Sequence, residues 1–500
     1  MLRRTGGSSD APRKGWEDGF PATPRPRSLS VGRLGTWGLN LPRFFLSAAS
    51  EADAPIQFRM TRWPEKCIVV GVMRSSGKPA FAANPHCGLY VHVPFCETKC
   101  GYCDFYSVAL KDRKTAPLVQ RLERELRLRL SDASRGVRTI FCGGGTPTLL
   151  PLDELTKLLR CLSELVRIAE LVEFTVEANP ATVDAAKAEL LVASGVTRVS
   201  MGAQSFFVEE LARLERLHSP DDIPPSVSVL RGCGVRQINL DLIFGIPGQS
   251  LDTWSQSLRR AIDLGPDHIA CYGLTYEPGT RLTAQRRTGR VIPCEENLEA
   301  DMYLSAIDTL AAAGFRQYEI SNFAKPGCEC RHNRMYWRNQ PYIGVGPSAA
   351  GYVDGRRYKN VADIAGYIRM IDRQGHAEAE SEIVEGETLM HELLLMQLRL
   401  NEGLSIDDFR ARTGVDPRTA FNGALSRLTD LGLVWISPTH IALTRQGRLV
   451  ADAVMVELSV HLGAPSRRLP VVPADALTLR EDEETAPRRR NIPMVRSNMR

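Results

Sequence analysis

The sequence predicts an α/β protein, a partial TIM-like (βα)6 barrel followed by a small C-terminal helical, winged-helix-like domain. Three observations predict this fold class. Six short apolar runs rich in β-branched residues recur between residues 89 and 274. Helical stretches separate these runs at spacings of roughly 30 to 40 residues, which is typical of a parallel βα array. From Glu387 the pattern changes to an apolar helix followed by further short helices and strands.

The expected strands and helices alternate along the barrel region. The strand runs are LYVHVPF (89–95), VRTIFC (137–142), EFTVEA (173–178), TRVSMGA (197–203), QINLDLIFG (237–245) and HIACYGL (268–274). The helical stretches include RLERELRLRL, LDELTKLLRCLSELV and VDAAKAELLVAS. The last of these helices is predicted to be capped by Thr182 and ended by Gly195. Six units are fewer than the eight of a complete barrel, and the site should lie where the carboxyl ends of the strands meet their loops.

The C-terminal region predicts a second, smaller domain. ETLMHELLLMQLRL is a strongly apolar helix, and the next helix begins with Ser405 and Asp408 at the spacing of a capping box. LVWISPTHIALT completes a winged-helix-like pattern. Residues 387–462 contain seven Arg, no Lys and nine Asp plus Glu, a formal charge of −2. Because a DNA-binding winged helix normally carries a basic face, we expect a structural or lid role instead.

Composition divides the chain into five segments. They are an N-terminal extension (1–82), the barrel (83–325), a connecting segment (326–386), the C-terminal domain (387–462) and a tail (463–500). The first and last segments lack sustained periodicity and are expected to be disordered. The scattered arginines of the extension suggest an organelle-transit sequence, and the alternative is a non-native upstream start with translation beginning near Met60 or Met73.

The composition is that of a soluble globular protein. Of 500 residues, 43% are hydrophobic and 24% charged, and no apolar run approaches the roughly 20 residues that span a bilayer. The net charge of +5 is small for this length, so no general affinity for nucleic acid or membrane surfaces is expected. Twelve cysteines are scattered along the chain, and no secretory signal is evident. This favours a reducing compartment and a cytoplasmic location, in which clustered cysteines are metal ligands or redox groups.

Three cysteines, Cys96, Cys100 and Cys103, lie in one polar loop directly after the first expected strand, in HVPFCETKCGYCDF. A zinc site would be expected to bring a second pair of cysteines or histidines, and none stands at a suitable spacing. A [4Fe–4S] cluster can be held by three thiolates, which leaves one iron open to a substrate or cofactor. Gly101 is expected to let the loop bend tightly. The alternative, three unpaired structural cysteines, is disfavoured by this spacing.

The spacing C-x3-C-x2-C, with Tyr102 directly before the third cysteine, resembles the radical S-adenosylmethionine (SAM) superfamily. The resemblance implies a radical SAM barrel in which the open iron binds the amino and carboxylate groups of SAM. The lead-in LYVHVPFC is similar to the branch that contains oxygen-independent coproporphyrinogen III oxidase and the heme chaperone HemW, both concerned with porphyrins. The likeness extends from Leu89 to Leu462.

Residues at the ends of the expected strands fall where this family contacts SAM. GGGTPT follows the second strand, and glycines there let a ligand approach the backbone. Glu177 ends the third strand, where an unpaired carboxylate would be costly to bury. The resemblance implies that Arg216 pairs the SAM carboxylate and that Asp241 bonds the ribose hydroxyls. The full set of implied SAM contacts is Tyr90, Tyr102, Gly144, Gly145, Thr146, Glu177, Gln204, Arg216 and Asp241. Each could instead be a buried polar residue satisfied by its neighbours.

Two features place the chain on the heme-chaperone side of this branch. Phe105 stands two residues after Cys103, where the oxidase has a fourth cysteine and HemW-like proteins have Phe. RHNRMYWRN matches the HemW hallmark HNxxYW, and the residues implied to hold heme are His332, Asn333, Tyr336 and Trp337. A neutral imidazole can ligate heme iron, and aromatic rings suit a porphyrin face. The alternative is that His332 and Trp337 anchor this segment into the barrel.

Two further features near the HNxxYW motif, an alanine and a pair of cysteines, bear on ligand binding. Ala350 stands where the family usually has His, which implies either a different heme contact or a greater reliance on His332. Cys328 and Cys330 form a C-x-C pair just before the motif. Two thiolates cannot complete a cluster, so accessory ligation by Cys330 is disfavoured.

The resemblance therefore predicts a heme chaperone that binds one [4Fe–4S] cluster, SAM and heme. It implies delivery of heme to acceptor proteins, with respiratory-chain proteins as candidates and transient contact with membrane proteins. The alternative is an enzyme, oxygen-independent coproporphyrinogen III oxidase, in which a radical abstracts hydrogen from a propionate side chain. Phe105 and the HNxxYW segment favour the heme chaperone over the oxidase. Nucleic-acid binding by the C-terminal domain is disfavoured by its charge.

Overall fold

The structure is a computed structural model that describes residues 87–111, 113–131, 136–460 and 462. The two segments predicted to be disordered, 1–82 and 463–500, lie outside the described residues. None of the helices in the described part of the chain is long and apolar enough to cross a bilayer.

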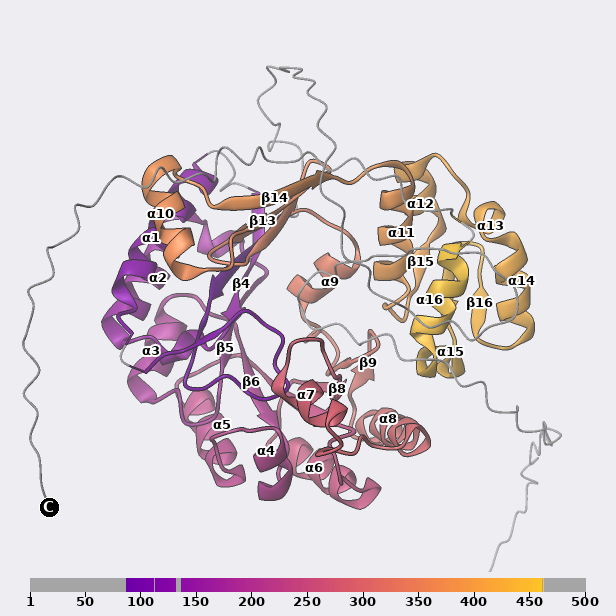
Figure 1. Cartoon of the computed structure of the whole chain (residues 1–500), viewed down its shortest axis with the longest axis horizontal. Helices are drawn as coiled ribbons and strands as arrows, with labels where there is room; N and C mark the ends of the chain where they lie inside the picture. Colours follow the sequence, from indigo (N-terminus) through magenta and orange to yellow (C-terminus); the bar gives the residue numbers. More distant parts are fainter. Residues whose placement is uncertain (1–86, 112, 132–135, 461, 463–500) are drawn as a thin grey trace, which may run out of the picture. The chain divides into compact units, whose positions relative to one another are not determined.

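Six parallel strands form the centre of the fold (Figure 1). They lie side by side in the order of the chain, and each neighbouring pair is parallel. This confirms the predicted βα array. The strands are β1 (Cys87–Val93), β4 (Val137–Gly144), β5 (Glu173–Ala178), β6 (Arg198–Gln204), β7 (Gln237–Phe244) and β8 (His268–Gly273).

Further strands extend both edges of this sheet. β11 runs parallel to β1, with Gly88 opposite Tyr342, and antiparallel β12, β13 and β14 follow it. At the other edge β10 and β9 are antiparallel to their neighbours. Within the described residues the outermost strands β14 and β9 do not pair with each other, so the barrel is partial, as predicted. The added strands are β9 (Arg316–Gln317), β10 (Asn322–Ala324), β11 (Tyr342–Val345), β12 (Ala350–Val353), β13 (Arg356–Asn360) and β14 (Glu378–Ile383).

Helices surround the sheet on its outer side (Figure 1). They are α1 (Ala116–Leu130), α2 (Leu152–Leu165), α3 (Ala185–Ala193), α4 (Val208–Arg213), α5 (Ile223–Gly232), α6 (Leu251–Asp263), α8 (Glu296–Ala312) and α10 (Ile364–Gln374). The prediction that Thr182 caps α3 is wrong. The Asp184 carboxylate accepts the N–H of Lys187 at 2.9 Å, whereas the Thr182 hydroxyl donates to the carbonyl of Asn179 at 2.7 Å. Asp184 therefore satisfies the first turn of the helix.

The two faces of the barrel strands differ in character. Alternate residues such as Leu89 and Val91 of β1 are fully buried in the core between sheet and helices. The intervening residues face the barrel interior, and many are polar, among them Glu173, Arg198 and Asn239. Each of these three side chains is at most 2% exposed. A polar interior of this kind must be satisfied by an internal network or by ligands.

The C-terminal domain combines helices with a small antiparallel sheet, as predicted. Its strands pair in the order β15, β17, β16. Ser405 caps α12 by accepting the N–H of Asp408, which is half of the predicted capping box. The elements are α11 (Gly386–Gln397), β15 (Leu404–Ser405), α12 (Ile406–Thr413), α13 (Pro417–Ala420), α14 (Asn422–Asp430), β16 (Val434–Ile436), β17 (His440–Leu443), α15 (Arg445–Leu449) and α16 (Ala451–Val460).

Candidate functional site

The cysteine loop is closed at its base by two short strands. β2 (Phe95–Cys96) pairs with β3 (Val108–Ala109), so Cys96 lies at the base of the loop. Cys100 and Cys103 lie on the loop itself, where the N–H of Cys103 donates to the carbonyl of Cys100 at 3.3 Å. Because β2 follows β1 in the chain, this pairing places the loop with its three cysteines beyond the carboxyl end of β1.

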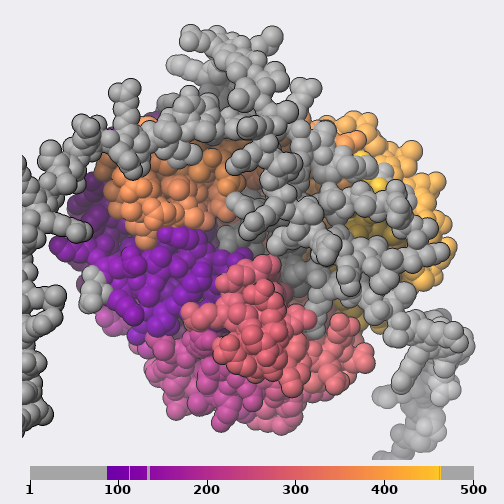
Figure 2. Space-filling view, viewed as in Figure 1, coloured from indigo at the N-terminus to yellow at the C-terminus, as the bar shows by residue number. Residues whose placement is uncertain are grey.

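Contacts with α7 (Arg281–Arg287) hold the loop in place. The N–H of Leu282 donates to the carbonyl of Gly101 at 2.9 Å, and the Arg281 guanidinium donates to the carbonyl of Lys99. The segments around the cysteine loop and α7 adjoin on the surface (Figure 2). A Cβ on Gly101 would lie 2.8 Å from Oε1 of Glu215. Glycine at this position therefore also permits a close approach to a neighbouring side chain, which the sequence did not indicate.

The three thiols lie close enough to influence one another. Burial raises the pKa of Cys103 to about 12, and the Cys100 and Cys96 thiols add to this rise. Nη1 of Arg216 lies 3.5 Å from Sγ of Cys100. In the described part of the chain no three Cys, His, Asp or Glu side chains close around a single metal ion. Neighbouring thiols beside a guanidinium fit a group that binds them as thiolates, because the cation favours their ionised form.

The glycine-rich loop after β4 packs against the ends of β2 and β5. Gly144 has a φ of +101°, and its N–H donates to Oε2 of Glu177 at 2.9 Å. A Cβ on Gly145 would lie 2.5 Å from the carbonyl oxygen of Phe95, which also accepts the N–H of Thr146 at 2.7 Å. The structure thus brings these four predicted SAM contacts together at the carboxyl end of the barrel.

Glu177 occupies an environment that disfavours its charged form. Burial raises its pKa to about 7, and the charge of Asp241 adds to the rise, although the Gly144 hydrogen bond and Arg198 oppose it. A carboxylate in this position is held ionised by a cation that binds next to it. It is therefore suited to receive a ligand ammonium group.

A second group of predicted residues gathers at the ends of β5 and β6. Nη2 of Arg216 donates to Oδ1 of Asn179 at 2.6 Å and to the carbonyl of Gly202 at 2.8 Å. Gln204 has a φ of +64°, a conformation that non-glycine residues rarely adopt outside constrained sites. Nδ2 of Asn179 donates to Oγ1 of Thr146 at 2.8 Å, which joins this group to the glycine-rich loop.

Asp241 and the two predicted tyrosines complete the carboxyl end. Burial raises the pKa of Asp241, whose Oδ1 accepts a hydrogen bond from Asn239 at 2.8 Å. Burial also raises the pKa of Tyr102, and Cys100, Cys103 and Asp241 add to the rise, whereas Arg216 opposes it. The Tyr90 hydroxyl lies 2.9 Å from Nδ1 of His92.

Sequence reasoning missed two residues at this end, Asn179 and His92. Asn179 links Arg216 to the glycine-rich loop through the hydrogen bonds given above. Nε2 of His92 lies 2.8 Å from the carbonyl of Tyr106, and burial lowers the pKa of His92 to about 4, so the ring is neutral. Asn179 stands two positions after Glu177, and His92 stands two positions after another predicted contact. Because a strand repeats every two residues, this spacing could have identified both.

The predicted heme residues lie at the opposite end of the sheet, on α9 (Arg331–Trp337). The Glu173 carboxylate, at the start of β5, accepts the N–H of Arg331 at 2.6 Å and that of His332 at 3.2 Å. Nδ1 of His332 lies 2.8 Å from Oγ1 of Thr139, near the start of β4. α9 therefore fills the amino ends of these strands. Its Tyr336 reaches into the barrel interior, where burial raises the pKa of Tyr336 and the predicted SAM residues Tyr90 and Glu177 add to the rise.

The HNxxYW side chains are largely buried. His332 has partners at both ring nitrogens, since Nε2 lies 2.9 Å from the Tyr336 hydroxyl, and burial lowers its pKa to about 3. The Arg399 guanidinium lies over the Trp337 ring at 4.6 Å from its centroid. These contacts correspond to the anchoring alternative. Iron ligation by His332 would require one of its two hydrogen bonds to break.

Comparisons with known proteins agree with this architecture. Residues 90–261 match the radical SAM superfamily, and residues 384–450 match the HemN C-terminal domain. The heme chaperone HemW of Escherichia coli (strain K12) is 39% identical over 383 residues, which cover 74% of this chain and 97% of that protein.

The chain belongs to the HemW family. The heme chaperone HemW of Bacillus subtilis (strain 168) is 35% identical over 367 residues, covering 73% of this chain and 97% of the relative. The solved structure of coproporphyrinogen III oxidase (HemN) from Escherichia coli matches with a TM-score of 0.67 and 23% identity, over 76% of this chain and 92% of that one. This likeness shows the shared fold. Membership of the radical SAM superfamily implies a [4Fe–4S] cluster and SAM.

Backbone contacts place Phe105 and Ala350, the two positions compared with the family pattern, in this HemW-family chain. The carbonyl of Phe105 accepts a hydrogen bond from Lys99 Nζ at 3.0 Å, so the residue closes the cysteine loop through its backbone. Ala350 begins β12, and its carbonyl lies against Gly344, which pairs with Tyr90 of β1. Ala350 is therefore separated from β1 by the intervening strand β11.

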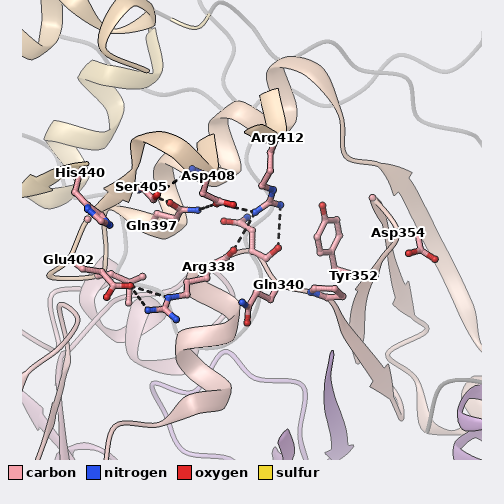
Figure 3. A pocket seen from close by; sticks show the side chains of 15 residues that line it. Arg338, Gln340, Tyr352, Asp354, Gln397, Glu402, Ser405, Asp408, Arg412 and His440 are labelled. Carbon is pink, nitrogen blue, oxygen red and sulfur yellow. Dashed lines mark hydrogen bonds and ion pairs between the residues drawn. The ribbon is translucent and has the colours of Figure 1, made fainter. Parts of the chain in front are cut away.

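A cavity of about 570 Å³ lies next to the end of α9 and the C-terminal domain of this HemW-family chain (Figure 3). Arg338 pairs with Glu402 at 2.7 Å, and Arg412 donates to the carbonyls of Arg338 and Asn339 at 3.3 Å each. The walls carry three carboxylates, those of Asp354, Glu402 and Asp408, against two guanidinium groups. Such polar walls do not suit a flat apolar ligand with two carboxylates, such as heme.

Proposed function

We propose that this HemW-family chain is a heme chaperone that binds a [4Fe–4S] cluster, SAM and heme and delivers heme to acceptor proteins. The observation that carries the proposal is its similarity to proteins named heme chaperone HemW, at 35% and 39% identity over 97% of each relative. The grouping of polar residues at the carboxyl end of the barrel supports the cofactor part.

Cys96, Cys100 and Cys103 are the proposed ligands of the cluster. When bound, the cluster supplies an open iron and an electron to SAM. The protein contributes the closed loop that presents the three thiols, and Arg216 beside Cys100 lowers the cost of holding thiolates there. Contacts with α7 fix the loop before any ligand binds.

The same end of the barrel offers complementary groups for each part of SAM. Glu177 would accept hydrogen bonds from the ammonium group, and the guanidinium of Arg216 would pair the carboxylate. Asp241 would accept hydrogen bonds from the ribose hydroxyls. The proposed pocket is completed by Tyr90, Tyr102, Gly144, Gly145, Thr146 and Gln204.

The proposed heme contacts are His332, Asn333, Tyr336 and Trp337. Because His332 is fully buried with both ring nitrogens bonded, heme ligation through it requires the ring to become accessible and the bond to Thr139 or to Tyr336 to break. Thr139→Val removes the Nδ1 partner and is expected to leave heme binding unchanged or tighter. His332→Ala is expected to abolish the heme absorption band of an iron–imidazole bond. If His332→Ala leaves heme affinity and the absorption spectrum unchanged, His332 is an anchor and not a heme ligand.

The proposal is tested by anaerobic reconstitution of the cluster followed by two assays. Heme titration followed by absorbance should show saturable binding. Incubation with coproporphyrinogen III and SAM should show no multiple-turnover decarboxylation, because Phe105 replaces the fourth cysteine of the oxidase pattern. Sustained decarboxylation would overturn the chaperone proposal in favour of the oxidase.

A further inference from the structure

A chain of hydrogen bonds that passes through the buried side chains of His268 and Asn239 connects the start of α9 to Asp241. The N–H of Cys330 donates to the Tyr318 hydroxyl oxygen at 3.3 Å, and this hydroxyl lies 2.9 Å from Nε2 of His268. Nδ1 of His268 lies 2.5 Å from Oδ1 of Asn239. Nδ2 of Asn239 then donates to Oδ1 of Asp241 at 2.8 Å. The chain therefore spans the barrel interior from its amino end to the proposed SAM pocket.

The direction of the bonds in this chain is set at the Asp241 end. The carboxylate only accepts, so Nδ2 of Asn239 faces it and Oδ1 of Asn239 faces His268. The neutral His268 ring therefore carries its proton on Nδ1 and donates to Oδ1 of Asn239. Its Nε2 then accepts from the Tyr318 hydroxyl, whose oxygen in turn accepts the N–H of Cys330.

The opposite orientation of Asn239 would place its carbonyl oxygen against the Asp241 carboxylate. His268 holds Oδ1 of Asn239 in place. His268 is fully buried, and Asn239 is only 1% exposed. The second amide hydrogen of Asn239 also has an acceptor, Oγ of Ser200 at 2.7 Å. Each donor thus meets an acceptor only in the observed direction, and a change of the His268 tautomer would disrupt the bond to Asp241.

We propose that Asn239, His268 and Tyr318 are positioning residues that fix the Asp241 carboxylate in the orientation that receives the ribose hydroxyls of SAM. The inference rests on the proposed function, because it takes Asp241 as the ribose contact. The three residues do not touch SAM themselves. They act by holding the carboxylate through the amide N–H of Asn239, because the Tyr318 hydroxyl favours the His268 tautomer that holds the amide oxygen, as outer hydrogen-bond partners orient metal ligands.

The test is equilibrium binding of S-adenosylhomocysteine to the anaerobically reconstituted protein, measured by calorimetry. A second ligand is the same molecule without its 2′- and 3′-hydroxyl groups. The variants are Asp241→Asn, Tyr318→Phe and the control Tyr303→Phe. Tyr303 is a matched buried tyrosine, since its hydroxyl donates to the carbonyl of Ile320 and accepts from Gln317, both at 2.8 Å, outside the chain to Asp241. Cluster content is measured for each variant by iron analysis.

Tyr318→Phe is expected to weaken binding of S-adenosylhomocysteine about tenfold, with unchanged iron content. The ligand without ribose hydroxyls should bind wild type and Tyr318→Phe equally. Tyr303→Phe should match wild type with both ligands, although it loses similar hydrogen bonds. If Asp241→Asn weakens binding and Tyr318→Phe does not, the positioning role is wrong while the proposed SAM site stands. If Asp241→Asn itself has no effect, the assignment of Asp241 to SAM fails first.

Discussion

Replacing Glu177 with glutamine should stabilise the cofactor-free protein above neutral pH while it weakens SAM binding. Burial raises the pKa of Glu177 to about 7 from an ordinary value of 4.5. The folded chain therefore holds the proton more tightly than the unfolded chain. Between these two pKa values, the free energy of unfolding falls as pH rises, because the buried carboxyl must ionise.

The size of this effect follows from the two pKa values. Each pKa unit corresponds to about 1.4 kcal/mol, so ionisation of Glu177 costs the folded state about 3 kcal/mol at most above pH 7. Glutamine has no charge to bury, and its amide oxygen can still accept the N–H of Gly144. Glu177→Gln should therefore match wild type near pH 4.5 and exceed its stability by up to about 3 kcal/mol at pH 8.

Urea unfolding of the cofactor-free protein at several pH values between 4.5 and 8 measures this difference. Other buried carboxyl groups, such as Asp452 with a pKa raised by burial to about 6, titrate in both proteins and cancel in the comparison. In the reconstituted protein the same substitution should weaken SAM binding, since the ammonium group loses a charged partner. A stability difference that does not change with pH would refute the reasoning.

Three further predictions concern packing and the cysteines. Gly344→Ala would place a Cβ 1.9 Å from a backbone oxygen of β12 and should lower the urea midpoint of unfolding sharply. The control Gly232→Ala would place a Cβ with no atom within 4 Å and should leave this midpoint unchanged or raise it. Arg399→Met should cost about 3–5 kcal/mol in the same assay, because it leaves the buried Glu319 carboxylate, 3.7 Å away, without its cation; a loss below about 1 kcal/mol would mean that Glu319 is protonated. Cys328→Ser should keep the iron content and visible absorption of the reconstituted protein, in contrast to serine at any of the three loop cysteines, and a loss of iron would make Cys328 a ligand.

The barrel and its carboxyl end could be predicted because their signals are local. Strand runs repeat with period two, and the cysteines, Glu177 and Asp241 each stand next to the end of such a run. The residue that caps α3 could not be predicted from residue type, since both Thr182 and Asp184 can cap a helix. The path of the chain after β5 determines where the helix begins and therefore which of them is the cap.

The position of α9 could not be predicted from local signals. Its anchor is a contact between His332 and Thr139, 193 positions apart in the chain. The motif suggested a heme face because an imidazole and aromatic rings are suited to that ligand. The same side chains are also suited to anchoring a helix in the barrel interior. Only the tertiary contacts with Glu173 and Thr139 distinguish an anchor from a heme-binding face.

The pairing of β11 with β1 has a consequence for the synthesis of the chain. Among the described strands of this sheet, β1 is the first to leave the ribosome, yet its outer neighbour and α9 lie in residues 331–345. Until that segment has been made, one edge of β1 has free backbone N–H and C=O groups, and the Glu173 carboxylate lacks the N–H donors of α9. Unpaired strand edges associate with other chains, so a nascent barrel halted before Arg331 is an aggregation-prone intermediate.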